Sequence, residues 1–81
     1  MKMTIIIRYS VISKTMLLEE NMEQYQSYGL EVIRFVGYAC SEEYTLHDIS
    51  TDKAVVEEMA RLFNEERLEP TRLIETVRNM L

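Results

Sequence analysis

The chain is poor in the residues that usually support or equip very small proteins: it has one cysteine, one proline, two glycines and no tryptophan in 81 residues. A single cysteine excludes a disulfide within the chain. A structural zinc site needs about four cysteine or histidine ligands, and Cys40 and His47 are the only two in the sequence. Gly29 and Gly37 are too few for a glycine-rich loop that cradles a phosphate. We therefore expect no metal and no cofactor.

Long apolar runs are also missing. The N-terminal run Ile5-Ile6-Ile7 ends at Arg8, whereas a signal peptide needs about 7–15 apolar residues and a membrane helix about 20. We expect neither export nor a membrane partner. Because the one cysteine is then free, the sequence predicts a reducing, cytoplasmic location.

Basic residues are outnumbered by acidic ones. Nine Lys and Arg against fourteen Asp and Glu give a formal net charge of −5. Nucleic-acid affinity depends largely on Lys and Arg that neutralise phosphates, and the sequence contains no block of four basic residues. These counts argue against DNA or RNA as a partner.

Length and hydrophobic content predict one folded domain over residues 1–81, since 47% of the residues are hydrophobic. A chain this short buries only roughly 60–65% of the surface that its unfolded form exposes, so its core is thin. Small domains gain further support from disulfides, metals or oligomerisation. Of these three, self-association is the one that the composition leaves open.

Three segments of the first half have the pattern of β-strands. Residues 4–12 alternate apolar and polar side chains, and a continuation of this strand over residues 14–19, with Leu17 on the same face, stays open. Residues 22–36 form the second segment, and the third runs to Ile49. The side chains expected on the inner face are Ile5, Ile7, Tyr9 and Val11, then Tyr28, Leu30, Val32 and Val36, and finally Tyr44 and Leu46. Short connections between the segments predict an antiparallel meander.

The turns are less sharply marked than the strands. Glu19-Glu20-Asn21 is the first plausible turn, and the second is expected near Gly37, with Ser41-Glu42-Glu43 as the alternative. Gly29 interrupts the second strand and is a candidate for a β-bulge, which would shift the alternation of its side chains by one residue.

The residues after Ser50 favour helices. Ser50 or Thr51 is expected to be the N-cap of the first helix, with Asp52 near the positive end of its dipole. Glu57 precedes Arg61 by four residues, a favourable spacing for an ion pair. The two apolar stripes are Val55, Val56, Met59, Leu62 and Phe63, and then Leu73, Ile74, Val77, Met80 and Leu81.

Pro70 suits the first position of the second helix. The predicted fold is α+β: a three-stranded antiparallel meander followed by two helices that pack on one face of the sheet, in the order βββαα.

Parts of the sequence resemble a known family. The step Tyr28-Gly29-Leu30, the segment 48–52 that opens a helix, and Pro70 followed by Leu73 and Val77 are similar to a small domain family of unknown function associated with anaerobic Gram-positive bacteria. The resemblance covers roughly residues 25–81. Glu69 stands where family members often have Ser before the proline, and Arg72 stands where they often have His. The resemblance implies a fold of this kind and no assigned activity.

Reactive side chains are scattered along the sequence. His47 and Asp48 are neighbours, but adjacent residues of a strand point to opposite faces and cannot form a hydrogen-bonded dyad. Cys40 and His47 would lie about 23 Å apart in an unbroken strand, although a turn at residues 41–43 would bring them closer. The adjacent glutamate pairs are expected to be solvated. We predict no catalytic residue.

The second sheet face is the feature that bears most on function. Helices can cover one face only, and the other face would carry Ile6, Ile12, Tyr25, Ile33 and Phe35 among the polar residues Arg8, Thr45 and His47. Five large apolar residues exceed the scatter of a solvated face, and the outer strands leave free edges. We predict an interface with a second copy or another protein. The alternative is that a bulge at Gly29 moves Tyr25 inward and leaves an ordinary surface.

Two functional classes follow. The first is an interaction or regulatory module without enzymatic activity. The second is a small metabolite-binding domain or enzyme, built at a dimer cleft from residues such as Arg8, Tyr44 and His47. A pocket larger than about 300 Å³ with converging polar groups would favour the second class, and a flat, dry, symmetric interface the first.

Overall fold

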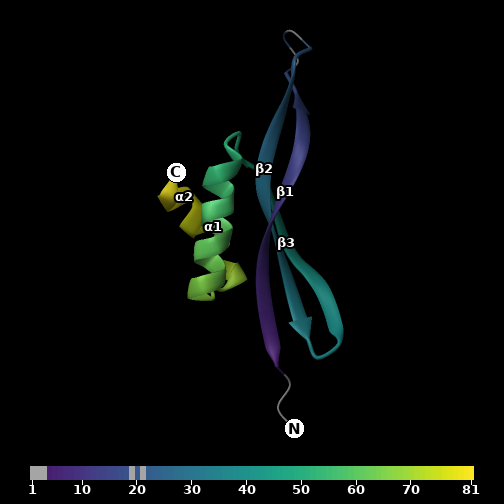
Figure 1. Cartoon of the computed structure of the whole chain (residues 1–81), viewed down its shortest axis with the longest axis vertical. Helices are drawn as coiled ribbons and strands as arrows, with labels where there is room; N and C mark the ends of the chain where they lie inside the picture. The colour runs from purple at the N-terminus through teal and green to yellow at the C-terminus, as the bar shows by residue number, and fades with distance from the viewer. Residues whose placement is uncertain (1–3, 19, 21) are drawn as a thin grey trace.

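The computed structural model describes residues 4–18, 20 and 22–81, and places a three-stranded sheet before two helices. The elements are β1 (Ile5–Leu17), β2 (Gln24–Val36), β3 (Ala39–Ser50), α1 (Lys53–Glu66), the short 3₁₀ helix η1 (Pro70–Arg72) and α2 (Leu73–Met80). The sheet order is β1-β2-β3, and both neighbouring pairs are antiparallel (Figure 1). This confirms the predicted α+β fold.

The sheet is longer than the helical layer. β1 and β2 form an unbroken ladder from Ile5 opposite Val36 to Leu17 opposite Gln24, whereas the pairing of β3 with β2 ends at Tyr28. Beyond that point the sheet narrows to a two-stranded ribbon that extends past α1 (Figure 1). The molecule is accordingly elongated, with extents of 57 × 25 × 19 Å.

The turn expected at Glu19-Glu20-Asn21 falls partly on residues 19 and 21, which lie outside the described residues. Leu18 and Glu23 flank this turn, and the Leu18 amide donates a 2.9 Å hydrogen bond to the carbonyl oxygen of Glu23. The second turn is at Gly37, where φ is 60°. Glycine adopts this left-handed conformation without steric cost. The alternative turn at residues 41–43 is wrong, because β3 runs through them.

The irregularity expected at Gly29 lies in β3. The ladder with β1 continues through Ile12 opposite Gly29, but Tyr28 and Leu30 of β2 pair with Ser50 and Leu46 of β3. Three residues of β3, 47–49, therefore lie where β2 has Gly29 alone. Gly29 is needed there because a Cβ atom at this position would lie 2.2 Å from the carbonyl oxygen of Leu46. The glycine therefore makes room for a close approach of the neighbouring backbone.

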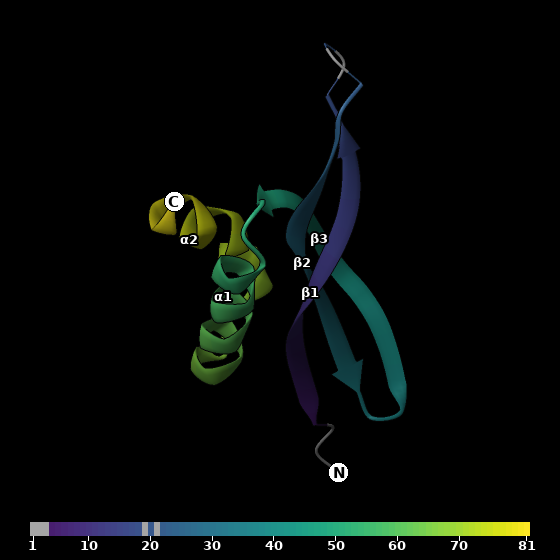
Figure 2. The ribbon, with the colours of Figure 1, turned by 45° about the horizontal axis from the view of Figure 1, so that its top comes forward.

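Both helices lie on the same side of the sheet (Figures 1 and 2). The buried core consists of Tyr9, Leu30 and Val32 from the sheet, Val56, Met59, Ala60 and Phe63 from α1, and Leu73 and Val77 from α2. The rings of Tyr9 and Phe63 meet edge to face with their centroids 5.5 Å apart, a favoured aromatic geometry. The apolar side chains of the strands and those of the helices therefore pack in one layer between the sheet and the helices.

Some residues expected to face inward are exposed. These are Ile5, Leu17, Tyr44, Val55, Ile74, Met80 and Leu81. On the helices, a sheet of three twisted strands is too narrow to cover the full width of two apolar stripes, so only the middle of each stripe is buried. Ile5 and Leu17 are the two end residues of β1, in a sheet that is longer than the helical layer.

The polar contacts of α1 also differ from expectation. The N-cap is Asp52, whose side chain accepts a 3.0 Å hydrogen bond from the Ala54 amide. Ser50 is still part of β3, and its hydroxyl oxygen accepts from the Asp52 amide. Arg61 binds Glu58 and Glu65 instead of Glu57. Its hydrogen bond to Glu58 lowers the pKa of that carboxyl group.

Candidate interaction surfaces

The face of the sheet turned away from the helices contains an apolar cluster. Ile6 of β1 lies opposite Phe35 of β2, and Arg8 lies opposite Ile33. Residues opposite each other across an antiparallel pair share a face, as do residues two apart along a strand. Ile6, Ile33 and Phe35 are therefore neighbours, and we call these three residues the outer patch.

Ile12 and Tyr25 share this face but lie farther along it. Ile12 is opposite Gly29 and Tyr25 is opposite Met16. Glu31 and its partners Ser10 and Thr45 form a polar row across the sheet. This row lies between the outer patch on one side and Ile12 and Tyr25 on the other. Along β2, Ile33 lies four positions after Gly29, a distance of about 13 Å. Three of the five residues expected at an interface are thus neighbours. The other two, Ile12 and Tyr25, lie on the same face but do not adjoin them.

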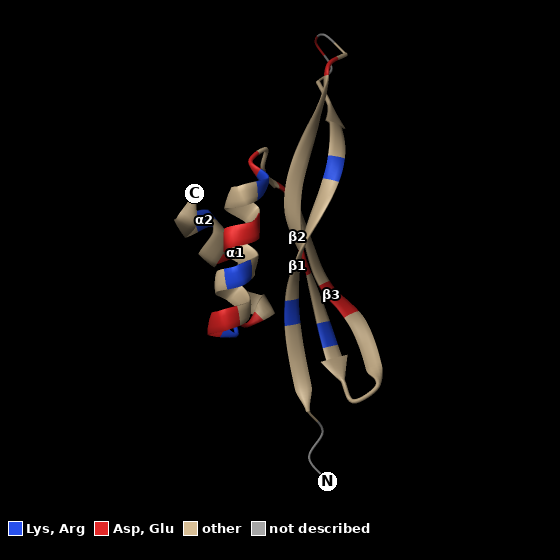
Figure 3. Cartoon of the chain, viewed as in Figure 1, with Lys and Arg blue, Asp and Glu red and all other residues tan. Residues whose placement is uncertain are grey.

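The exposure of these five residues differs. Ile6 is 51% exposed, whereas Ile12, Tyr25, Ile33 and Phe35 are partly buried. The ribbons of the three strands are largely uncharged in Figure 3, in contrast to the alternating charges of α1. Beside the outer patch, Ile33 lies between Arg8 on β1 and Glu42 on β3.

The candidate reactive groups do not converge. Cys40 and His47 are both exposed on β3, seven positions apart and with no turn between them. Asp48 has a left-handed φ of 56° and accepts a hydrogen bond from the hydroxyl of Ser27, which is 1% exposed. Asp48 therefore holds the irregular end of β3 against β2. Within residues 4–18, 20 and 22–81, no three His, Cys, Asp or Glu side chains lie close enough to hold a metal ion.

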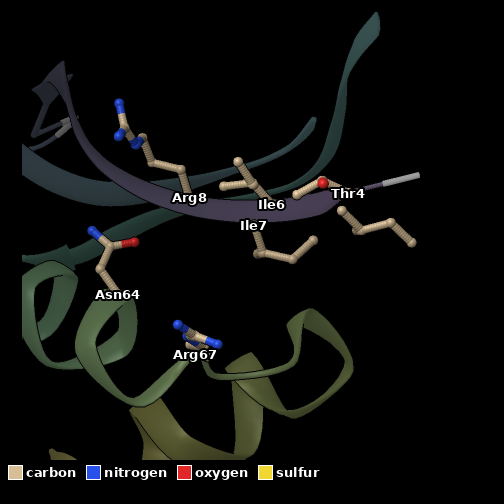
Figure 4. A pocket seen from close by; sticks show the side chains of 7 residues that line it. Thr4, Ile6, Ile7, Arg8, Asn64 and Arg67 are labelled. Atoms are coloured by element: carbon tan, nitrogen blue, oxygen red, sulfur yellow. The ribbon is translucent and has the colours of Figure 1, made fainter. Parts of the chain in front are cut away.

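A groove of about 610 Å³ runs along the free edge of β1, between this strand and the end of α1. Residues 4–8, Asn64 and Arg67 line it. Figure 4 shows Arg67 reaching from the end of α1 toward β1, with Ile7 on the same side of the strand and Arg8 on the other side. Sequence reasoning missed Asn64 and Arg67, because no local pattern indicates that the end of a helix meets a strand more than fifty residues earlier.

Asn64 closes one end of this groove by binding the backbone of β1. Its side-chain oxygen accepts a 2.8 Å hydrogen bond from the Tyr9 amide, and its side-chain nitrogen donates a 3.0 Å hydrogen bond to the Tyr9 carbonyl. The Tyr9 hydroxyl donates to the carbonyl of Leu68 at 2.6 Å. Burial raises the pKa of this phenol to about 12. Tyr9 is therefore fixed through both its backbone and its side chain.

Arg8, Tyr44 and His47, the residues expected to form a site at a dimer cleft, do not line a common hollow. Arg8 lines the groove of β1, whereas Tyr44 lines a smaller hollow of about 220 Å³ with Glu43, Pro70, Thr71 and Ile74. His47 belongs to neither hollow. No helix in the described part of the chain has the length and apolarity needed to span a bilayer.

Comparison with known proteins gives a family and no function. The chain belongs to the family of unknown function DUF6514, whose model matches residues 1–81. This match extends beyond residues 25–81, the part of the chain that carries the resemblance. No curated protein and no solved structure matches the chain.

Proposed function

We propose that this member of the family is a protein-interaction module without catalytic activity, which self-associates through the outer face of its sheet. The observation that carries the proposal is the outer patch: three large apolar side chains lie next to one another on a face that neither helix covers. Contiguous apolar surface of this kind is typical of association sites.

The charges on this face are complementary to those of a second copy, in addition to its apolar side chains. A two-fold interface uses the same patch on both subunits, so each group must find its complement on the same surface. Arg8 and Glu42 have opposite charges and lie on either side of Ile33. Two copies related by a two-fold axis near Ile33 would place each arginine beside the partner's glutamate. Such pairs favour one orientation over others.

The length of the face supports an interface of sufficient size. A stable interface buries roughly 1,200–2,000 Å² in total, which is more than three side chains supply. Ile12 and Tyr25 continue the same face along the ribbon, so we include them at its far end. Self-association would also support the thin core, because binding that requires the folded state stabilises it.

We expect this association in a reducing cytoplasm, since Cys40 lies exposed on β3 and opposite Phe35 of the outer patch. An oxidising compartment would favour disulfides between copies at this position. The occurrence of relatives in anaerobic Gram-positive bacteria stays a prediction.

Light scattering or sedimentation tests the proposal. The unmodified protein is expected to be a dimer at high micromolar concentration, and Ile6→Thr combined with Ile33→Thr is expected to make it a monomer. Val55→Thr is the matched control, because Val55 is 38% exposed on α1 and distant from this face. A monomer at high micromolar concentration without any substitution would contradict self-association.

The second candidate is a metabolite-binding protein, and one observation favours it: the groove beside β1 exceeds the size of about 300 Å³ that a small-molecule site needs. Its polar groups do not converge, because the amide of Asn64 binds the backbone of Tyr9, and Arg8 and Arg67 lie on opposite sides of the strand. Thermal-shift measurements against a metabolite set decide between the candidates. Reproducible stabilisation by one compound would favour the second.

A further inference from the structure

The free edge of β1 presents backbone groups that can pair with another strand. The Tyr9 amide and carbonyl both bind Asn64, on the side away from β2, whereas the Thr4 carbonyl accepts a hydrogen bond from the Gly37 amide. In an antiparallel ladder this orientation alternates with every residue. The amides and carbonyls of Ile5 and Ile7 therefore point to the free edge, and none of them has a backbone partner among the described residues.

The groove beside this edge is positively charged. Arg8 and Arg67 line it, and no Asp or Glu does, although the whole chain has a net charge of −5. Neither arginine forms an ion pair within the part of the chain that the structure describes. Arg67 lies on the same side of β1 as Ile7 (Figure 4). A carboxylate beside Ile7 would therefore meet a free guanidinium, which binds carboxylates with strong, charge-assisted hydrogen bonds.

We propose that this groove binds an extended, acidic segment of another protein, which adds a fourth strand beside residues 5–7 and places a carboxylate on Arg67. Strand addition of this kind uses backbone hydrogen bonds for affinity and alternate side chains for specificity. The new strand ends where Asn64 already occupies the backbone of Tyr9. In an antiparallel arrangement, the acidic residue lies opposite Ile7 and apolar residues lie opposite Ile5 and Ile6.

A second copy fits this edge less well than an acidic segment. A two-fold contact between two β1 edges would bring together the same groups from each copy, and Arg8 and Arg67 would then face a second pair of arginines. Nucleic acid would supply negative charge but no alternating amides and carbonyls for Ile5 and Ile7. The segment contacts Arg67 on the side of β1 that carries Ile7, whereas the dimer uses Arg8 on the other side of the strand, so the segment and the dimer proposed above do not exclude each other.

Amide NMR titration with the peptide acetyl-Thr-Glu-Val-Val-Thr-amide tests the proposal. We expect shifts at the amides of Ile5 and Ile7 at peptide concentrations up to about 1 mM, a range that detects even weak binding. The same peptide with Gln in place of Glu is expected to bind roughly tenfold more weakly, and with Lys more weakly still. Absence of shifts at these amides, or equal binding of the Lys peptide, would overturn the proposal.

Two arginine variants separate the groove from general charge effects. Arg67→Gln is expected to raise the Kd of the Glu peptide roughly tenfold, and Arg78→Gln on the exposed surface of α2 is expected to leave it unchanged. Equal effects of the two substitutions would contradict a site at Arg67. Arg67→Gln is also expected to leave the mass measured by light scattering unchanged. A shift toward monomer would mean that a second copy occupies this edge, and the proposal would be wrong.

Discussion

The side-chain amide of Asn64 takes the place of a neighbouring strand for Tyr9, since it accepts from the Tyr9 amide at 2.8 Å and donates to the Tyr9 carbonyl at 3.0 Å. The two residues are 55 positions apart in the sequence. Unpaired edges invite association with other chains, and proteins commonly protect them by covering their backbone groups. Here a residue near the end of α1 covers the middle of β1 and leaves the groups of Ile5 and Ile7 open.

Asn64→Ala is expected to lower the free energy of unfolding by about 2 kcal/mol. The substitution removes two hydrogen bonds and leaves the amide and carbonyl of Tyr9 without partners. Urea unfolding measures the change. Asn79→Ala is the control, because Asn79 is exposed near the end of α2. A similar loss in both variants would show that the pairing with Tyr9 contributes little.

Tyr9→Phe is expected to cost about 1 kcal/mol at neutral pH. The ring still packs against Phe63, but the hydrogen bond from the hydroxyl to the Leu68 carbonyl is lost. Urea unfolding at neutral pH measures this difference. A variant as stable as the unmodified protein would mean that water replaces the tyrosine hydroxyl at no cost.

The stability of the protein is expected to fall as the pH rises from about 10 to about 12. The pKa of Tyr9 is about 12 in the folded chain and 10.0 in the unfolded reference. Within this window the unfolded state has released the proton and the folded state still holds it, so rising pH favours unfolding. The contribution of Tyr9 is fully present below pH 10. Unfolding measured at several pH values should show a shallower decline in Tyr9→Phe, and identical declines would contradict the shifted pKa.

Gly29→Ala is expected to destabilise the protein by at least about 2 kcal/mol. The added methyl group would lie 2.2 Å from the Leu46 carbonyl oxygen, so β3 would have to move away from β2. Gly37→Ala is the comparison, since its cost is limited to placing an alanine at a φ of 60° in a turn. Thermal unfolding of both variants should give the larger loss at Gly29. The reverse order would indicate that β3 shifts easily.

Arg67→Gly is expected to stabilise the protein by about 0.5–1 kcal/mol. Arg67 ends α1 with a φ of 54°, and glycine adopts this conformation without the steric cost of a side chain. The Leu68 amide can keep its 3.0 Å hydrogen bond to the Phe63 carbonyl. Thermal unfolding tests this expectation, and a loss of stability would show that the arginine side chain makes a contact that matters for folding.

The fold could be predicted from the sequence because its signals are local. Alternation placed Tyr9, Leu30 and Val32 on the buried face, and helical spacing placed Phe63 and Val77 there. Neither Ser50 nor Thr51 is the cap of α1, because Ser50 is still paired in β3 and the helix begins only at Lys53, which puts Asp52 at the cap position. Local sequence could not show how far the last strand extends, since that depends on its partner.

The sequence could not show which strand carries the irregularity at Gly29, for a similar reason. A glycine within a strand indicates either a bulge or the close approach of another backbone, and the sequence alone does not distinguish these two roles at Gly29. Only the register shows that the ladder with β1 is continuous and that the extra residues belong to β3.

The sequence by itself determined the order of the elements, the face that each strand buries and the apolar character of the second sheet face, because these depend on spacings of two to four residues. The tertiary structure alone decided that Ile6, Ile33 and Phe35 meet while Ile12 and Tyr25 stand apart, since strand register sets which side chains are neighbours. It also decided that Asn64 and Arg67 meet β1 to form a groove. That meeting depends on the packing of α1 across the sheet, and contacts between distant segments follow from the shape of the whole core.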